Sequence, residues 1–254
     1  MSTLQTSNNT GTDLKIRVGQ RLGTAAEYVA VSSTMDENGR KICADVGCDH
    51  GYLSIYLIEK GICDFVYASD INEKPVSIAR KNIAARDTRG IHLGEKISIR
   101  LGDGLSGLEN AGINHIIICG MGGEVISGII DRAKAFRKSG VKFILQPMSS
   151  EYELREWLSQ SGFEISDETL IRDSGRIYTV MLAEYTGKEY TFTKAELMLG
   201  RHNIKKGGEL LSELCGRKLV HAKNLLKQKD VSKEDSELYR ELSDLYSELC
   251  ERTE

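Results

Sequence analysis

The segment Lys41–Tyr52, KICADVGCDHGY, decides the fold. Its apolar first half predicts a buried strand, and its second half carries two glycines, Gly47 and Gly51, with carboxylates beside them. The following stretch, Leu53–Gly61 (LSIYLIEKG), has helical spacing with a wide apolar face. Strand, glycine turn and helix in this order predict the opening of a βαβ nucleotide-binding unit, in which glycines let the backbone approach a ligand closely.

A second apolar run, residues 65–68, follows the helix and ends in Asp70. An acidic residue roughly 20 positions beyond the glycines is where a ribose hydroxyl pair is normally held. The turn is not a dinucleotide fingerprint, because a carboxylate stands at Asp49 and would repel a pyrophosphate on the helix N-terminus. Asp45 and Asp49 together favour a ligand with positive charge and no phosphate here, which S-adenosylmethionine satisfies. The alternative is a purely structural βαβ turn.

The composition is typical of a soluble globular protein. The chain has 254 residues, of which 40% are hydrophobic and 28% charged, enough for one α/β domain and a smaller unit. No apolar run approaches the ~18 residues of a membrane span, and the N-terminus lacks the layout of a secretory signal. The six cysteines form no C-x-x-C pair, so neither a disulfide framework nor a metal site is expected. We expect a cytoplasmic protein without metal or membrane partner.

Element order follows from apolar periodicity and breakers. Residues 1–13 are rich in Ser, Thr and Asn and are predicted to be disordered, and a helix is predicted from Leu14 to the turn at residues 36–39. Further strands are expected at 97–101, 115–119 and 141–145, and further helices at 75–86, 124–138 and 152–161. Residues 163–171 and 176–185 predict an antiparallel hairpin at the sheet edge. This is the layout of a class I methyltransferase: a Rossmann-like α/β domain over 14–187, with a seven-stranded sheet whose last strand is antiparallel.

The character of the chain changes after Tyr185, and residues 188–254 are predicted to form a small helical domain. Thr193 can cap a helix, and leucines at 238, 242, 245 and 249 have coiled-coil-like spacing. Residues 194–229 contain nine Lys/Arg and three Asp/Glu, whereas residues 230–254 contain three and nine. Opposite charges on two helices favour an antiparallel hairpin. An overall net charge of −3 therefore does not exclude a polyanionic partner.

Several motifs resemble one known family. DVGCDHGYLSIYL, ASDINEKP, IRLGDGL, CGMGG and ILQP, in this order, and then LREWLSQSGFEI and RIYTVM, resemble the bacterial tRNA adenine-22 N1-methyltransferases, the TrmK family. The resemblance covers about residues 14–185 and a helical tail. It implies transfer of a methyl group from S-adenosylmethionine to N1 of adenine 22 in tRNA, with the tail helping to hold the RNA.

The strand ends and the resemblance together nominate the site residues, because ligands of open α/β sheets bind at the carboxyl ends of the strands. Residues expected to bind the cofactor are Arg21, Asp45, Gly47, Cys48, Asp49, His50, Gly51, Asp70, Ile71, Asp103, Gly104 and Gly120. Residues expected at the reacting groups are Asp49, Gly120, Met121 and Gly122. Residues expected to contact tRNA are Arg17, Arg21, Gln146, Pro147, Lys205, Lys206, Arg217, Lys218 and Lys223.

Other functions stay open at this point. The chain could be a class I methyltransferase for another RNA position, a protein or a small molecule, or a non-catalytic RNA-binding module with this fold. An oxidoreductase is disfavoured by Asp49. His50 is expected to be a packing residue rather than an acid or base, and the first helix and the tail could simply present solvated charges. The sequence leaves the oligomeric state unknown, with a monomer slightly favoured.

Overall fold

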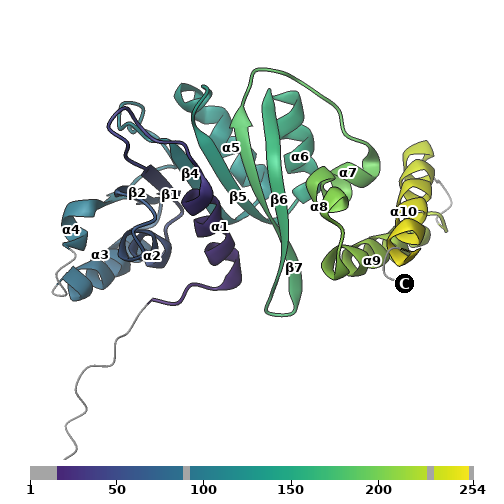
Figure 1. Cartoon of the computed structure of the whole chain (residues 1–254), viewed down its shortest axis with the longest axis horizontal. Coiled ribbons are helices and arrows are strands. Elements are labelled where there is room, and N and C mark those ends of the chain that lie inside the picture. The colour runs from purple at the N-terminus through teal and green to yellow at the C-terminus, as the bar shows by residue number, and fades with distance from the viewer. Residues whose placement is uncertain (1–15, 88–91, 228–231, 252–254) are drawn as a thin grey trace, which may run out of the picture.

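The computed structural model describes residues 16–87, 92–227 and 232–251. They build a seven-stranded sheet in the order β3-β2-β1-β4-β5-β7-β6 (Figure 1). The first five strands are parallel, and β7 is antiparallel to both β5 and β6. The strands are β1 (Ile42–Val46), β2 (Phe65–Asp70), β3 (Ile97–Leu101), β4 (His115–Gly122), β5 (Lys142–Ser149), β6 (Phe163–Asp173) and β7 (Arg176–Tyr185). The predicted Rossmann-like class and antiparallel hairpin are confirmed.

Helices cover both faces of the sheet, and the strands are accordingly apolar on both sides. Along β4, Ile117 packs with the α1 and α2 side while Ile116 and Ile118 pack with the α5 and α6 side. These helices are α1 (Gln20–Val31), α2 (Tyr52–Glu59), α5 (Gly123–Arg132) and α6 (Glu151–Gln160). The continuous β-branched run in β4 is therefore explained by burial on two faces rather than by alternation.

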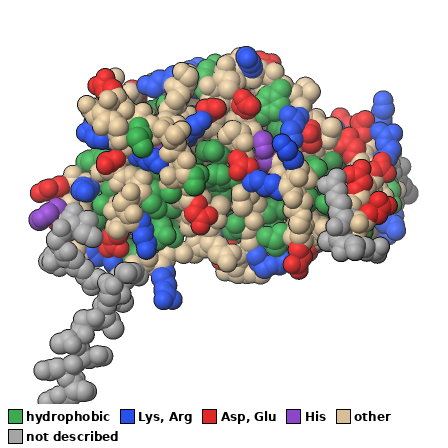
Figure 2. Space-filling model, in the orientation of Figure 1, with side chains coloured by type: hydrophobic (Ala, Val, Ile, Leu, Met, Phe, Trp, Pro, Cys, Tyr) green, Lys and Arg blue, Asp and Glu red, His purple; other side chains and the backbone are tan. Residues whose placement is uncertain are grey.

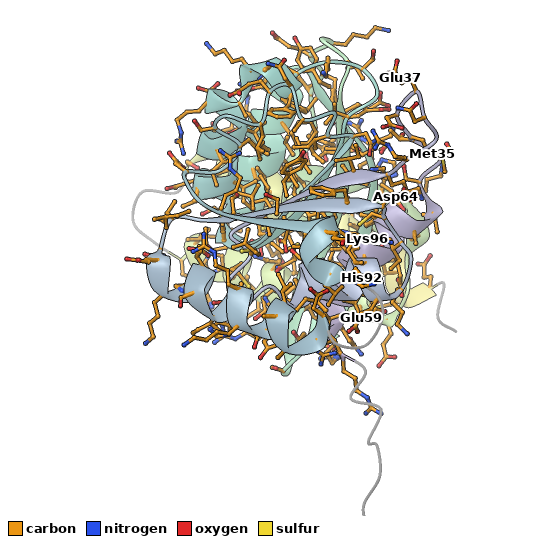
Figure 3. All side chains as sticks on the ribbon, turned by 90° about the vertical axis from the view of Figure 1, so that its left-hand side faces the viewer. Met35, Glu37, Glu59, Asp64, His92 and Lys96 are labelled. Carbon is orange, nitrogen blue, oxygen red and sulfur yellow. The ribbon has the colours of Figure 1, made fainter. Side chains whose placement is uncertain are left out.

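The end of the sheet that carries β3 is closed by two further helices, α3 (Glu73–Asp87) and α4 (Leu93–Lys96). Figure 3 looks at this end, where His92 precedes the one-turn α4, Lys96 is its last residue and Glu59 marks the end of α2. Leu93 is fully buried beneath α4 and packs in the same core as Ile97 of β3.

After β7 the chain is helical, with α7 (Lys194–Leu199), α8 (Arg201–Lys206), α9 (Glu209–Leu225) and α10 (Lys233–Glu251). The predicted cap at Thr193 is present as a full capping box with Glu196. Leu242 and Leu249 of α10 are buried against α9 in a separate apolar cluster. Among the helices of the described ranges, none is long and apolar enough to cross a membrane.

Several predicted boundaries were wrong, for identifiable reasons. The first helix begins at Gln20 rather than Leu14, because residues 16–19 have no regular secondary structure and Ile16 is buried in the core that it shares with α2. The helix predicted to reach Lys138 ends at Arg132 and is followed by a short 3-10 turn that buries Phe136. Strands β4 and β5 run on to Gly122 and Ser149 because irregular pairing continues beyond Cys119. The predicted disordered residues 1–13 lie outside the described ranges.

Candidate active site

Two hollows meet at the carboxyl edge of the sheet, between β1 and β4, where the strand order reverses. One has a volume of about 360 Å³ and is lined by Asp70, Asp103 and the Gly120 turn. The other, of about 410 Å³, is lined by Arg21, Asp45 and the residues that follow β1. We name them the Asp70 hollow and the Asp45 hollow. Because Gly47, Cys119 and Gly120 line both, they form one continuous cleft, at the place where open α/β sheets bind ligands.

The turn after β1 forms the floor where the two hollows meet. Gly47 has φ +75°, and its N–H and that of Cys48 donate to the Ser69 carbonyl at 2.8 and 2.9 Å. A Cβ at Gly47 would lie 2.1 Å from Met121 Cε and would displace that side chain, and the positive φ itself favours glycine. Gly51, also with positive φ, starts α2 and is not a lining residue.

Four carboxylates line the cleft: Asp45, Asp49, Asp70 and Asp103. Asp70 Oδ1 accepts from the Asn72 N–H at 2.9 Å and Oδ2 from the Asp49 N–H at 3.3 Å, which leaves further lone pairs on both oxygens. Asp103, exposed, pairs with Arg132 at 3.1 Å. Asp45 is buried, and burial raises its pKa to about 6 although the Ser54 hydroxyl donates to it at 2.6 Å.

The thiols of Cys48, in the turn, and of Cys119, in β4, are not poised for nucleophilic chemistry. Burial raises the pKa values of the Cys48 and Cys119 thiols, so neither is a thiolate at neutral pH. The His50 ring packs edge-on against Tyr52 at 6.0 Å, and its Nε2 lies 3.6 Å from an Asp49 carboxylate oxygen.

The Gly120–Met121–Gly122 segment faces the turn after β1 from the end of β4. The Gly120 N–H donates to Gln146 Oε1 at 3.2 Å, and Gly120 has φ +78°. Gln146 is fully buried, while Met148 is 38% exposed and lines the Asp45 hollow. Pro147 pairs with Met121 between two register shifts, which brings the ends of β4 and β5 together.

The structure does not bring every predicted residue to the cleft. Arg17 lies in a third hollow, and the nominated cations of the tail lie on α8 and α9. Two of the latter are engaged by the protein itself: Lys206 pairs with Asp167 at 2.7 Å, and Arg217 pairs with Glu213.

The cleft also contains residues that the sequence reasoning missed. Ser69, Asn72, Val125, Ile129 and Arg132 line the Asp70 hollow. Asn72 follows Asp70 closely and could have been found from its position at a strand end. The last three come from α5, and nothing in their spacing distinguishes a cleft-facing position from a surface one.

The strand order, and a carboxylate-lined cleft at its reversal without a phosphate cradle, define a class I S-adenosylmethionine-dependent methyltransferase. The family model for TrmK, tRNA (adenine(22)-N(1))-methyltransferase, matches residues 43–249. The chain belongs to this family.

Individual relatives agree with this assignment. The tRNA (adenine(22)-N(1))-methyltransferase of Bacillus subtilis strain 168 is 26% identical over 218 residues, which span 84% of this chain and 86% of the relative. The crystal structure of the B. subtilis m1A22 tRNA methyltransferase TrmK is similar with a TM-score of 0.70, covering 93% of this chain and 98% of that one. A Streptococcus pneumoniae structure in complex with S-adenosyl-L-methionine is 27% identical with a TM-score of 0.72, covering 92% and 99%.

Proposed function

We propose that the chain transfers a methyl group from S-adenosylmethionine to N1 of adenine 22 in tRNA. The observation that carries this function is the continuous cleft, lined by Asp45, Asp49, Asp70 and Asp103, in a chain of this family. S-adenosylmethionine supplies an electrophilic methyl group on a sulfonium. Residues 14–187 would form the methyltransferase unit, and residues 188–254 a helical unit that helps to hold the RNA.

The cofactor would be held by groups that line the two hollows. Asp70 would accept from the ribose hydroxyls and Asp103 from the adenine amino group, with the exposed Ile71 beside them offering an apolar contact. Asp45 would face the positively charged amino-acid end of the cofactor, since an ionised carboxylate favours a nearby cation. Supporting positions are Gly47, Cys48, Asp49 and His50 in the turn after β1, with Gly104 and Gly120 around it.

The chemistry asks for positioning rather than for a general base. N1 of neutral adenine already presents a lone pair, so the protein must align this atom with the methyl carbon, which is a proximity effect. The product base is cationic, and the carboxylates of Asp49 and Asp45 would favour that charge in the transition state. Gly120, Met121 and Gly122 would let an extruded adenine approach the backbone closely.

Replacing Asp70 with alanine should weaken S-adenosylmethionine binding by roughly tenfold to a hundredfold. Losing a hydrogen bond to a charged group costs roughly 1.5–3 kcal/mol, which corresponds to this change in affinity. Isothermal titration calorimetry measures it directly. Glu73→Ala, on the first turn of α3 outside the cleft, is the matched control and should keep the wild-type affinity. An unchanged affinity in Asp70→Ala would remove the ribose assignment.

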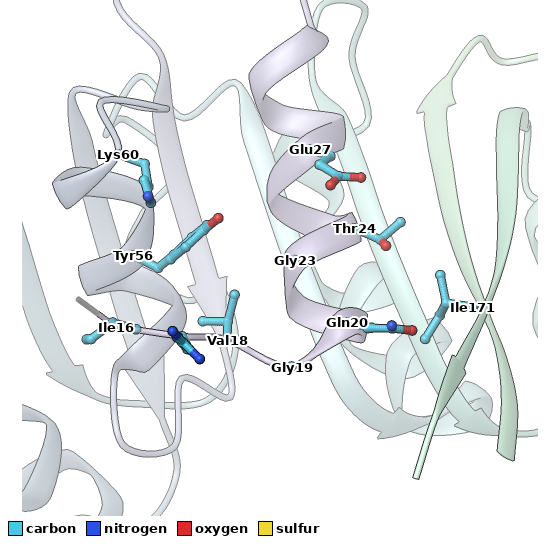
Figure 4. Close-up of a pocket in the computed structure, with 11 residues that line it drawn as sticks. Ile16, Val18, Gly19, Gln20, Gly23, Thr24, Glu27, Tyr56, Lys60 and Ile171 are labelled. Atoms are coloured by element: carbon cyan, nitrogen blue, oxygen red, sulfur yellow. The ribbon is translucent and has the colours of Figure 1, made fainter. Parts of the chain in front are cut away.

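Two regions offer cations to the phosphates of the RNA. A hollow of about 600 Å³ between the 16–19 segment, α1 and α2 is lined by Arg17 and Lys60 (Figure 4), neither of which has an ion-pair partner within the described ranges. On the tail, Lys205, Lys218 and Lys223 also have no ion-pair partner within the described ranges. Lys206 and Arg217 do have one. Acidic side chains gather over α10 (Figure 2), which favours α8 and α9 as the tail face toward RNA. Gln146 and Pro147, which the sequence nominated for RNA contact, are buried and line neither hollow, so we do not propose them as RNA contacts.

Phosphate contacts at the α1–α2 hollow should appear in the salt dependence of binding. Each lost contact lowers the slope of log K against log salt by about one. Arg17→Met and Lys60→Met should each do so in filter-binding titrations with unmodified tRNA. Lys96→Met, on α4 at the β3 edge of the sheet and outside the lining of this hollow, is the matched control. Slopes equal to that of the wild type in both variants would show that the RNA does not use this hollow.

The function itself is tested by incubating the chain with S-adenosylmethionine and unmodified tRNA and mapping the product by primer extension. A methyl group at N1 blocks the pairing edge of adenine, so reverse transcription should stop next to position 22. A stop at another position would favour a class I methyltransferase for a different RNA site, and the absence of transfer with retained RNA binding would favour a non-catalytic module.

A further inference from the structure

The guanidinium of Arg21 is already occupied by protein groups. Its Nε donates to Asp173 Oδ2 at 2.8 Å, and its Nη1 contacts Gln146 Oε1 at 3.3 Å and Met148 Sδ at 3.0 Å. The guanidinium also lies over the Tyr178 ring, 5.2 Å from its centroid. These partners come from the end of β5 and from the β6–β7 hairpin, so Arg21 joins three parts of the chain that meet at the cleft.

The carboxamide of Gln146 is held in one orientation by this contact. Its Oε1 accepts from Arg21 Nη1 and from the Gly120 N–H at 3.2 Å, while its Nε2 donates to the Pro147 carbonyl at 2.7 Å. A flipped carboxamide would turn its NH2 group toward two other donors, inside a fully buried position. The two donors on Oε1 therefore select the orientation that keeps the Gly120 N–H bound.

Gly120 in turn fixes the place where the two hollows meet. It lines both of them, and the next residue, Met121, lies against Gly47 across the cleft. A shift of the Gly120 backbone would therefore displace part of the cleft lining against which cofactor and target base must align. Misplacement by about 1 Å can cost roughly a hundredfold in rate.

We propose that Arg21 is a positioning residue, which fixes the Gln146 carboxamide and through it the Gly120 backbone, and that Asp173 holds Arg21 in place. This assignment rests on the proposed function, and it replaces a direct contact of Arg21 with an RNA phosphate or with the cofactor. Asp173 lies at the end of β6 in the β6–β7 hairpin, so the hairpin takes part in shaping the cleft.

The kinetic test compares Arg21→Lys and Arg21→Met with the wild type in single-turnover methylation at saturating cofactor and tRNA. Lysine keeps the charge but cannot reach Asp173 and Gln146 with two separate nitrogens. We expect both variants to react about tenfold or more slowly, with unchanged affinities for tRNA and cofactor and an unchanged salt slope of tRNA binding. If Arg21 contacts a phosphate instead, Arg21→Lys should keep the wild-type activity. Arg21→Met should then lower the salt slope of tRNA binding by about one and keep the wild-type rate at saturation. That result would overturn the proposal.

A second measurement needs neither cofactor nor RNA. Hydrogen exchange at the Gly120 amide should be faster in Arg21→Met and in Asp173→Asn than in the wild type, because the acceptor of this N–H is no longer held. Amides in the centre of β4, such as that of Ile117, should keep their protection and report that the fold is intact. Unchanged exchange at Gly120 would overturn the positioning role, and it would do so whether or not the chain methylates tRNA.

The Gln146 link is tested by a double-mutant cycle. If Arg21 acts through the Gln146 carboxamide, Arg21→Met combined with Gln146→Met should react no more than about twofold more slowly than the slower single variant. Fully additive losses would mean that the two side chains act independently, and the proposed chain of contacts would be wrong.

Discussion

Replacing Arg155 with methionine should lower the free energy of unfolding by about 3–5 kcal/mol, the loss typical of breaking a buried ion pair by removing one partner. Arg155 is 1% exposed and its partner Glu168 is fully buried, with Nε and Oε1 2.7 Å apart. Arg155 also donates to the Leu197 carbonyl at 2.7 Å and to Thr179. The variant would leave the Glu168 carboxylate uncompensated, because its second oxygen has no hydrogen-bond partner among the described residues.

The double variant Arg155→Met/Glu168→Met is the matched control. It removes both charges, and apolar replacements of a buried pair are often neutral, so most of the lost stability should return. Urea denaturation followed by circular dichroism measures all three proteins. A loss below about 1 kcal/mol in the single variant, the value of a surface pair, would mean that water reaches Glu168 and would contradict the burial seen here.

The location of this pair has a structural consequence. Arg155 belongs to α6, Glu168 to β6 and Leu197 to α7, so the pair fastens the first helix of the tail to the sheet. Gly200 lies against the same carboxylate, and a Cβ there would be 2.4 Å from Glu168 Oε2. Because Gly200 has no side chain, it leaves room for the Glu168 carboxylate, which holds Arg155 against α7 and so anchors the tail.

The second large effect is expected at Asp45. Asp45→Asn should make the protein more stable by up to about 3 kcal/mol at pH 7.5, and it should bind S-adenosylmethionine more weakly. Burial raises the pKa of Asp45 from 3.8 to about 6. Each pKa unit corresponds to about 1.4 kcal/mol of differential interaction. A group whose pKa is raised in the folded state contributes stability at low pH and loses it as the pH rises through the folded value. Asparagine cannot ionise and avoids this loss, while it removes the charge that we propose faces the cationic amino-acid end of the cofactor.

The measurement is the difference in unfolding free energy between Asp45→Asn and the wild type from pH 4 to pH 8. The advantage of the variant should be largest above pH 6 and should vanish near pH 4. Burial lowers the pKa of His115 to about 4, so this residue destabilises both proteins alike as the pH falls. Its contribution cancels in the difference. A difference that does not change with pH would mean that Asp45 is not desolvated, and the stabilisation would then need another cause.

Much of the fold could be predicted because its signals are local. The strand–turn–helix at residues 42–59, the carboxylate that ends β2 and the closing hairpin depend on periodicity and breakers within a few residues. The same holds for the Thr193 capping box. Boundaries were less reliable where tertiary contacts overrode the local pattern: residues 16–19 stay outside the first helix, with Ile16 packed beside α2, and β4 continued through glycines because β5 paired with it.

The site residues fall into the same two groups, those whose place the sequence predicts and those whose contacts only the tertiary structure decides. The sequence by itself determined that Asp45, Asp70, Asp103 and the Gly120 turn stand at strand ends, and the parallel topology then brings strand ends to one edge. Only the tertiary structure decided that Arg21 binds Asp173 and Gln146, which are 152 and 125 positions away, and that Arg155 binds Glu168 rather than facing solvent. Such pairs depend on how helices dock on the sheet, and docking is set by the packing of whole faces, which no local spacing of residues encodes.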